Sequence, residues 1–418
     1  MNKGSKTVKS VNEYKTICVM GLGYIGLPTA SLLATKGFSV TGVDVSQKVV
    51  DTINKGEIHI VEPDLDILVK SAVHSGNLSA SLEPIEADVF IIAVPTPFKD
   101  GGPDHISGKQ PDLSYIEAAT KKIAPFVKPG NLVILESTSP VGTTDEVVAS
   151  LLKAAGHDVG GSVYVAHCPE RVLPGRILIE LVENDRVVGG INDASTQVTV
   201  EFYERFVRGA VLPTTAKTAE MVKLTENSSR DVQIAFANEL SMICETEGIN
   251  TWEVIELANR HPRVNILQPG PGVGGHCIAV DPWFIVDRSP EYSRLIKTAR
   301  DVNDDKPNWV VERVKKCADK FKQPKIACLG LAFKADVDDL RESPAFDIVK
   351  RLKNENIGEL LVCEPNLKSH REFTLHHVES AVSNADIVVL LVDHKQFKGM
   401  KAAELSEKVV VDTRGVVK

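Results

Sequence analysis

Short apolar runs alternate with segments of helical periodicity along the N-terminal half of the chain. The first run is TICVM at residues 16–20, and the segment after GLGYIG, LPTASLLATKGF, has the spacing of a helix that ends at Gly37. Another apolar run, FSVTGVDV, comes next. Later runs of the same kind lie at 87–97, 131–144, 162–175 and 185–190. Strands that alternate with helices predict an open α/β sheet, with ligands at the carboxyl ends of the strands.

The middle of the chain has a different pattern, that of long helices. Residues 215–248 are predicted to form one helix, TWEVIELANRH forms a second, and a third is expected from roughly Pro290 to Phe321. KIACLGLAFK at 325–334 then begins a smaller alternation of strands and helices. The predicted fold class is α/β, with two doubly wound Rossmann-like domains joined by a central helical region. The expected domain limits are 1–205, 206–310 and 311–418.

The residues GLGYIG place Gly21, Gly23 and Gly26 in G-x-G-x-x-G spacing, with Tyr24 and Ile25 between them. Such glycines let the backbone approach a pyrophosphate, and the N-terminus of the following helix stabilises its charge. An acid near the end of the second strand, Asp44, can accept hydrogen bonds from the ribose hydroxyls and would repel a 2′-phosphate. The pattern predicts NAD as the cofactor, and a glycine turn without a ligand is the alternative.

Polar residues also end the later strands of this predicted sheet. Thr96 and Thr138 are expected to hydrogen-bond the ribose or nicotinamide region of NAD, with capping of the next helix as the alternative. Glu170 and Arg171 lie at a similar strand end. They are predicted to be catalytic or to face the substrate, and a structural ion pair is the competing interpretation.

Three polar residues share one face of the long central helix. Lys223, Asn227 and Arg230 are spaced i, i+4 and i+7. A polar face is most often the solvated side of a helix. Asn227 is a poor helix former, however, and its presence favours a functional face instead.

A glycine- and proline-rich stretch, RVNILQPGPGVGGHCIAVDPWF, follows the second predicted helix. Its closely spaced glycines and prolines exclude a regular helix or strand, so the backbone must turn tightly. Cys277 comes directly after the glycines, beside His276, and Asp281 follows four residues later. A thiol on such a loop is open to a substrate, and nearby charge can hold it as the thiolate. A cysteine that merely packs is the alternative.

The last domain carries cations after its first predicted strand. Lys334 and Arg341 flank this loop, and two cations at a strand end suit a diphosphate. The aspartates at 336, 338 and 339 could instead pair with them as a structural network.

Composition narrows the class of protein. The 418 residues have a net charge of -8, which argues against a nucleic-acid or anionic-membrane partner. None of the seven cysteines has zinc-site spacing, so no metal is expected, and those at 18, 244, 328 and 363 are predicted to be reduced core residues. The N-terminal residues lack the apolar core of a signal peptide, and no run is long enough to span a membrane. A cytoplasmic, soluble protein is expected.

With these motifs in view, the whole chain resembles the UDP-glucose/GDP-mannose dehydrogenase family. The resemblance rests on GLGYIG, PTP, ESTSPVGTT, CPERVLPG, EMVKLTEN, GVGGHC and GLAFK in this order. It implies an NAD-dependent, four-electron oxidation of the C6 alcohol of a nucleotide sugar to a carboxylate. Cys277 matches the family's nucleophile, which forms a thiohemiacetal and then a thioester that water hydrolyses. Lys223 matches the acid/base lysine, and Asn227 and Asp281 match residues that hold the reacting oxygen or water.

The resemblance also assigns residues to the ligands. Its substrate-binding positions are Arg171, Val172, Lys223, Asn227, Arg230, His261, Arg263, Gly274, Phe333 and Lys334. Arg341 matches an arginine that reaches the cofactor or the UDP, and Glu170 matches a catalytic glutamate. Arg263 matches a residue supplied across a dimer interface, so a homodimer is expected.

Two departures from the glucose branch favour a UDP-N-acetylhexosamine substrate. Pro174 stands where UDP-glucose dehydrogenases carry a second glutamate, and Ala279-Val280 stands where they carry Pro-Lys. The expected substrate is UDP-N-acetyl-D-mannosamine, with UDP-N-acetylglucosamine as the nearest alternative. A β-hydroxyacid dehydrogenase needs neither Cys277 nor a third domain. A non-catalytic nucleotide-sugar or NAD-binding module would leave Cys277 and Lys223 without a role.

Overall fold

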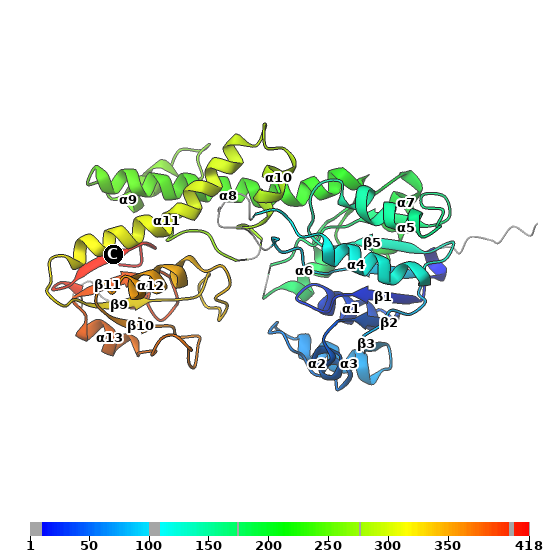
Figure 1. Ribbon diagram of the computed structural model, residues 1–418, viewed down its shortest axis with the longest axis horizontal. Helices are drawn as coiled ribbons and strands as arrows, with labels where there is room; N and C mark the ends of the chain where they lie inside the picture. The colour runs from blue at the N-terminus through cyan, green and yellow to red at the C-terminus, as the bar shows by residue number, and fades with distance from the viewer. Residues whose placement is uncertain (1–10, 100–108, 174, 276, 401–404, 418) are drawn as a thin grey trace, which may run out of the picture. The chain divides into compact units, whose positions relative to one another are not determined.

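The computed structural model describes residues 11–99, 109–173, 175–275, 277–400 and 405–417 (Figure 1). The chain forms two compact units, Met1–Thr225 and Glu226–Lys418, and each is described below by itself. One helix, α8 (Ala216–Thr246), carries the chain from the first unit into the second. The fold class predicted from the sequence is confirmed, whereas the proposed division into three domains stays a prediction.

Among its described residues, the first unit contains one eight-stranded sheet in the order β3-β2-β1-β4-β5-β6-β7-β8. Its strands are β1 (Thr16–Met20), β2 (Ser39–Val43), β3 (Leu78–Ser81), β4 (Val89–Ile92), β5 (Leu132–Leu135), β6 (Tyr164–His167), β7 (Arg186–Gly190) and β8 (Val211–Thr215). All neighbouring pairs are parallel except β6 and β7. The first six strands follow a doubly wound order that reverses direction between β1 and β4, where this fold binds its ligand.

Helices cover both faces of this sheet. They are α1 (Gly26–Thr35), α2 (Gln47–Asn54), α3 (Leu65–His74), α4 (Ser114–Ile123), α5 (Ser150–Ala154), α6 (Ile177–Glu183) and α7 (Asp193–Tyr203), with short helical turns η1 (Val11–Glu13), η2 (Ala124–Phe126) and η3 (Thr144–Ala149). Alternate residues of one strand enter different cores: Ile17 and Val19 pack on the side of α1 and α7, and Cys18 and Met20 pack on the side of α4. Strands buried on both faces read as unbroken apolar runs, and this is why their positions are visible in the sequence.

The second unit begins with helices and ends with a smaller sheet. The helices are the rest of α8, α9 (Thr251–Ala258), α10 (Asp281–Arg288), α11 (Arg294–Ala318), α12 (Pro344–Asn354) and α13 (Val378–Asn384). The strands are β9 (Lys325–Leu329), β10 (Glu359–Cys363), β11 (Ile387–Leu390) and β12 (Val409–Asp412), all parallel, in the order β10-β9-β11-β12. α11 and α12 pack on one face of this sheet and α13 packs on the other.

In the larger sheet, the sequence located the central strands better than the two edge strands. β3 and β8, the two edges of the larger sheet, were not predicted, because LSAS lacks bulky strand formers and VLPTT contains Pro213. Proline is tolerated at an edge, where its missing N–H breaks no ladder bond. α10 was also missed. The third predicted helix starts later than expected, at Arg294, because the residues around Ser293 form a turn first.

A buried carboxyl group joins the end of β5 to α7. Glu136 directly follows β5, is 2% exposed, and accepts a hydrogen bond of 2.8 Å from the hydroxyl of Tyr203. Burial, and after it the charge of Glu170, raise the pKa of Glu136 from 4.5 to about 7. The folded protein therefore holds a proton on Glu136 at pH values where the unfolded chain has already released it.

We predict that Glu136→Gln flattens the pH dependence of stability between pH 4.5 and 7. In this window the unfolded chain binds fewer protons, so the free energy of unfolding of the wild type falls as the pH rises, by up to about 3 kcal/mol. The amide still accepts from Tyr203 and cannot ionise. Urea unfolding at pH 5 and pH 8 measures the difference, with the exposed Glu204→Gln as the control. Parallel pH profiles of wild type and Glu136→Gln would contradict the prediction.

Candidate active site

The loop between β1 and α1 depends on glycine at two positions for internal packing. Gly21 has φ +92°, and a Cβ there would lie 2.7 Å from the carbonyl oxygen of Ala93. A Cβ on Gly26 would lie 1.8 Å from the carbonyl oxygen of Gly21. Both contacts are with backbone atoms, so neither glycine can be replaced without moving the loop.

Gly23 is different, because a Cβ there would meet no protein atom within 4 Å. The backbone conformation of Gly23 is also one that other residues adopt, since its φ is not positive. Any requirement for glycine at this position therefore comes from something outside the protein. A pyrophosphate lying against the loop at the start of α1 fits this requirement.

Asp44 follows β2 and fixes the same loop. Its Oδ2 accepts from the backbone N–H of Leu22 at 3.1 Å, and its Oδ1 accepts from the N–H of Ser46 at 2.9 Å. The carboxylate is half-buried at the carboxyl end of the sheet, and each oxygen keeps a second lone pair. Asp44 can therefore hold the loop and still accept hydrogen bonds from a ribose.

The two threonines predicted to contact the cofactor lie together. The hydroxyl of Thr96, after β4, donates to the carbonyl oxygen of Thr138, after β5, at 2.6 Å. Ser137 ties the same two strand ends, because its hydroxyl donates to the carbonyl oxygen of Val94 at 2.7 Å. These bonds place both threonines at the carboxyl end of the sheet, where the glycine loop also lies. Their contact with NAD stays a prediction.

Glu170 lies in a buried ion pair. One of its carboxylate oxygens accepts from Arg186 at 2.8 Å, both side chains being almost fully buried, and the other accepts from the N–H of Arg171 at 2.7 Å. Removing either partner of such a pair would leave a buried charge unpaired. The contacts favour the structural interpretation of Glu170 over a catalytic one. The guanidinium of Arg171 donates to the carbonyl oxygen of Asp185, and Val172 packs at the edge of the core.

In the second unit, glycines bring the loop before Cys277 close to the segment after β9. A Cβ on Gly275 would lie 3.0 Å from the ring of Phe333, and a Cβ on Gly274 would lie 2.2 Å from the carbonyl oxygen of Glu342. Gly272 has φ +142° and packs on Pro344. The structure therefore joins the predicted cysteine loop to the predicted nucleotide-binding segment.

Cys277 lies at the end of this loop with its side chain exposed. Its carbonyl oxygen accepts from the N–H of Asp281, the first residue of α10, at 2.8 Å. Asp281 is 3% exposed, and its Oδ2 accepts from the amide of Asn227 at 2.5 Å. Helix α8, helix α10 and the cysteine loop thus meet at one place, where Asn227 and Asp281 are in direct contact.

The remaining predicted residues are more exposed. Arg230, His261, Arg263 and Lys334 have exposed side chains, and Arg341 makes a bidentate ion pair with Asp339 at 2.6–3.1 Å. Arg341 thus adopts the structural pairing named as its alternative, and a role toward NAD or UDP stays a prediction. Lys223 lies in the first unit and Cys277 in the second, so their proximity also stays a prediction. Pro174 and His276 lie outside the described residues.

Glu364 holds the loop after β9, a role that the sequence reasoning missed. It follows β10 as Asp44 follows β2, and its Oε2 accepts from the N–H groups of Leu331 and Ala332 at 2.7 and 3.0 Å. His394 also contacts this oxygen, at 3.1 Å. The signal was present in ELLVCEP, a strand that ends in an acid. Because two backbone N–H groups and His394 already contact this carboxylate, the smaller sheet does not repeat the ribose site of the larger one.

Two doubly wound sheets, a dinucleotide loop and an exposed cysteine on a glycine loop define a nicotinamide-dependent dehydrogenase with a second nucleotide-binding unit. Family models match nearly the whole chain: the NAD binding domain at residues 15–207, the central domain at 217–305 and the UDP binding domain at 327–418. The chain belongs to the UDP-glucose/GDP-mannose dehydrogenase family. Its cofactor is NAD, and it is a nucleotide-sugar dehydrogenase. No helix of the described residues is long and apolar enough to cross a bilayer.

Individual relatives cover nearly the full length. A Ralstonia nicotianae protein described as an NDP-N-acetyl-D-galactosaminuronic acid dehydrogenase is 58% identical over 416 residues, covering 97% of this chain and 96% of the relative. A UDP-N-acetyl-D-mannosamine dehydrogenase of Campylobacter jejuni is 55% identical over 414 residues, covering 96% and 99%. The solved UDP-N-acetyl-mannosamine dehydrogenase Cap5O of S. aureus has a TM-score of 0.87 at 44% identity, covering 97% of this chain and 96% of that one.

We predict that Gly23→Ala weakens NAD binding without destabilising the fold. The new methyl group meets no protein atom and would lie where the pyrophosphate approaches, so the Kd for NAD should rise about tenfold or more while the melting temperature stays within about 2 °C. Titration calorimetry and thermal unfolding measure the two quantities. Gly26→Ala is the contrasting variant, because its methyl group collides with Gly21 and should lower stability as well. An unchanged Kd for Gly23→Ala would place the cofactor elsewhere.

Proposed function

We propose that this enzyme oxidises the C6 alcohol of UDP-N-acetyl-D-mannosamine to the carboxylate through a covalent intermediate on Cys277. The observation that carries the proposal is the exposed thiol on a loop packed against Phe333 in the UDP-binding domain. A sugar whose nucleotide lies on this domain would present its far end to the cysteine loop. Relatives with this substrate in their names, at 53–55% identity, support the choice of sugar.

Bound NAD supplies the hydride acceptor in both oxidation steps. Lys223 takes the proton of the C6 alcohol as the first hydride leaves, and its charge stabilises the developing oxyanion. The thiolate of Cys277 then adds to the aldehyde carbon to give a thiohemiacetal. Loss of the second hydride gives a thioester, so four electrons leave the sugar in total. Water attacks the thioester carbonyl, the C–S bond breaks, and the thiolate of Cys277 is restored.

Asn227 and Asp281 serve the oxygen and water steps. The amide of Asn227 is held by Asp281, which leaves a second N–H for the reacting oxygen. Asp281 is assigned to orient the attacking water. The glycines before Cys277 carry no side chains that could block the approach of a substrate to the thiol. Glu170 is not assigned a chemical step, because its carboxylate is held by Arg186 and the N–H of Arg171.

The C2 and C4 configuration of the sugar is the point at which alternatives differ. The relative at 58% identity carries a galactosaminuronic acid name, and this observation favours an NDP-N-acetyl-D-galactosamine-derived substrate as the second candidate. UDP-N-acetylglucosamine is the third. The reaction on Cys277 is the same for all three sugars. Since NAD and nucleotide sugars are cytoplasmic metabolites, the enzyme is proposed to act in the cytoplasm.

We predict two NADH for each UDP-N-acetylmannosamine consumed, and at most one with Cys277→Ser. The serine variant lacks the thiolate that tethers the aldehyde, so its second oxidation should slow by about 10³-fold or more. NADH absorbance at limiting substrate, with mass spectrometry of the product, measures both. The gluco and galacto sugars are run in parallel. Two NADH from one of these sugars alone would identify that sugar as the substrate, and unchanged turnover of Cys277→Ser would overturn the covalent role of Cys277.

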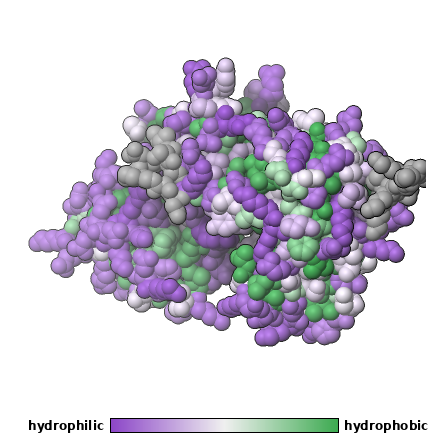
Figure 2. Space-filling model, turned by 45° about the vertical axis from the view of Figure 1, so that its right-hand side comes forward, coloured by the Kyte–Doolittle hydropathy of each residue, from purple (hydrophilic) through white to green (hydrophobic). Residues whose placement is uncertain are grey.

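We also propose that the enzyme is a homodimer formed through its central helices. Surface apolar residues are ordinarily scattered among polar ones, as Figure 2 shows for one face of the protein. Phe236 and Ile243, two helical turns apart on α8, are 56% and 54% exposed, and Leu257 on α9 is 64% exposed. A second copy that covers these side chains would bring its Arg263, which follows α9, toward the partner's substrate.

The dimer proposal predicts that the double variant Phe236→Glu/Ile243→Glu is monomeric in light scattering, because two carboxylates would be buried at the interface. The exposed Ile179→Glu on α6 is the matched control and should remain dimeric. If Arg263 acts across the interface, mixing inactive Arg263→Ala and Cys277→Ser proteins should restore about a quarter of the wild-type sites, one per mixed dimer. A double variant that stays dimeric would exclude this interface.

A further inference from the structure

The loop that carries Cys277 leaves the helical region at Gly270, between two prolines. Pro269 and Pro271 have no N–H, so the N–H of Gly270 is the one backbone donor of these three residues. This N–H donates to the side-chain oxygen of Asn238 on α8 at 2.8 Å. All three residues of the loop's origin are buried. The direction in which the chain enters the glycine loop therefore depends on one side-chain acceptor.

The orientation of the Asn238 amide is fixed by its other end. Asn238 is fully buried, and its Nδ2 donates to Oδ1 of Asn303 on α11 at 2.9 Å. Asn303 cannot reverse its own amide, because its Nδ2 donates to Asp231 at 2.8 Å, and Asp231 pairs with the buried Arg300 at 2.6 Å. A chain of polar groups thus points the oxygen of Asn238 at Gly270.

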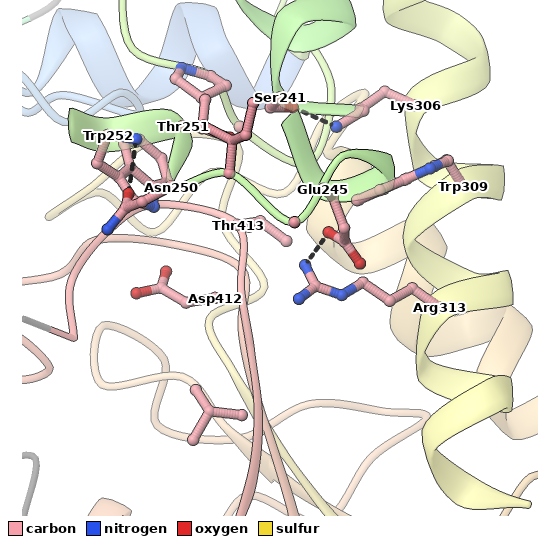
Figure 3. Close-up of a pocket in the computed structure, with 15 residues that line it drawn as sticks. Ser241, Glu245, Asn250, Thr251, Trp252, Lys306, Trp309, Arg313, Asp412 and Thr413 are labelled. Atoms are coloured by element: carbon pink, nitrogen blue, oxygen red, sulfur yellow. Dashed lines mark hydrogen bonds and ion pairs between the residues drawn. The ribbon is translucent and has the colours of Figure 1, made fainter. Parts of the chain in front are cut away.

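Lys306 holds the backbone at the same point of α8. Its ammonium group donates to the carbonyl oxygen of Asn238 at 3.3 Å and to the hydroxyl of Ser241 at 2.7 Å, as Figure 3 shows for Ser241. The ammonium lies 4.0 Å from the centre of the Trp309 ring. Burial lowers the pKa of Lys306 to about 7. This buried group, costly to remove from water, connects α11 to α8 beside the origin of the loop.

The opposite side of Gly270 is also closed. Arg414, which follows β12, donates to the carbonyl oxygen of Pro269 at 3.3 Å and is held by Asp393 at 2.8 Å. A Cβ on Gly270 would lie 2.6 Å from this guanidinium. A cavity of about 350 Å³ lies next to these groups and is lined by Pro269, Gly270 and Lys306. Because this space is not filled by protein atoms, the hydrogen bonds from Asn238 and Arg414 hold the origin of the loop in place.

We infer that Asn238 is a positioning residue for Cys277: its side-chain oxygen, fixed through Asn303, sets the course of the glycine loop and thereby the place of the thiol. Six residues intervene between Gly270 and Cys277, and the three glycines among them, at 272, 274 and 275, pack on Pro344, Glu342 and Phe333. A change of direction at Gly270 would alter these close contacts together. The inference rests on the proposed role of Cys277, but the geometry of the loop can be tested without turnover.

The first test is Asn238→Ala, with Ser241→Ala as the matched control on the same helix. Ser241 bonds Lys306 but makes no hydrogen bond to the loop. Asn238→Ala should lower kcat about tenfold to a hundredfold, since a displacement of about 1 Å at a reacting group has effects of this size, and leave the KM for NAD within about twofold. Ser241→Ala should change neither by more than about twofold.

The rate at which iodoacetamide alkylates Cys277, followed by peptide mass spectrometry, gives a readout independent of the reaction. It should change at least about threefold in Asn238→Ala and not in Ser241→Ala if the loop has moved. An altered alkylation rate alongside a Cys277→Ser enzyme that still turns over would overturn the proposed function and keep this inference. Unchanged kcat and an unchanged alkylation rate in Asn238→Ala would overturn this inference and leave the proposed function standing.

Asn238→Asp keeps the inference testable if the alanine variant does not fold. The carboxyl group accepts from Gly270 in both protonation states, but it donates to Asn303 only when protonated. Relative to the wild type at each pH, both kcat and the alkylation rate of this variant should fall as the pH rises through the pKa of the new carboxyl. A ratio to wild type that is constant with pH would show that the orientation of this side chain does not position the cysteine.

Discussion

Close backbone approach at glycine is the constraint on which the cofactor loop of the first unit and the cysteine loop of the second unit both depend. In the first unit, Gly21 and Gly26 let the loop after β1 fold back on itself and on the end of β4. In the second, Gly274 and Gly275 let the cysteine loop touch Phe333 and the segment before α12. A single Cβ at any of these positions would overlap backbone or a packed ring. The glycines therefore set where the cofactor loop and the thiol can lie, and the neighbouring polar groups act on a backbone already confined.

Buried charges reinforce these loops because each has a partner from a distant part of the chain. Arg186 on β7 neutralises Glu170, and Arg300 on α11 neutralises Asp231 on α8. Glu136 is handled in another way: burial raises its pKa and keeps it protonated at the end of β5. Each solution costs desolvation, and each joins elements whose relative position the catalytic loops require.

The two sheets show how one architecture supports different sites. Both end their second strand in the sheet with an acid that accepts from the loop after the first strand. Asp44 is half-exposed and retains acceptors for a ribose, whereas Glu364 is buried against His394 and is fully used inside the protein. The smaller sheet, which lies in the UDP binding domain, therefore does not offer the ribose site of the larger sheet.

The sequence by itself determined the local features: the central strands, the long helices, the dinucleotide loop, the glycine loop and the exposed cysteine. These follow from the period of apolar residues and from steric rules that act over a few positions. Tertiary structure alone decided the partners. Three contacts depend on which elements meet in the folded chain. They are the ion pair of Glu170 with Arg186, the hydrogen bond from Gly270 to Asn238, and the hydrogen bond from Arg414 to Pro269. A polar side chain carries no local sign of its distant partner, because packing of the whole unit brings the two together.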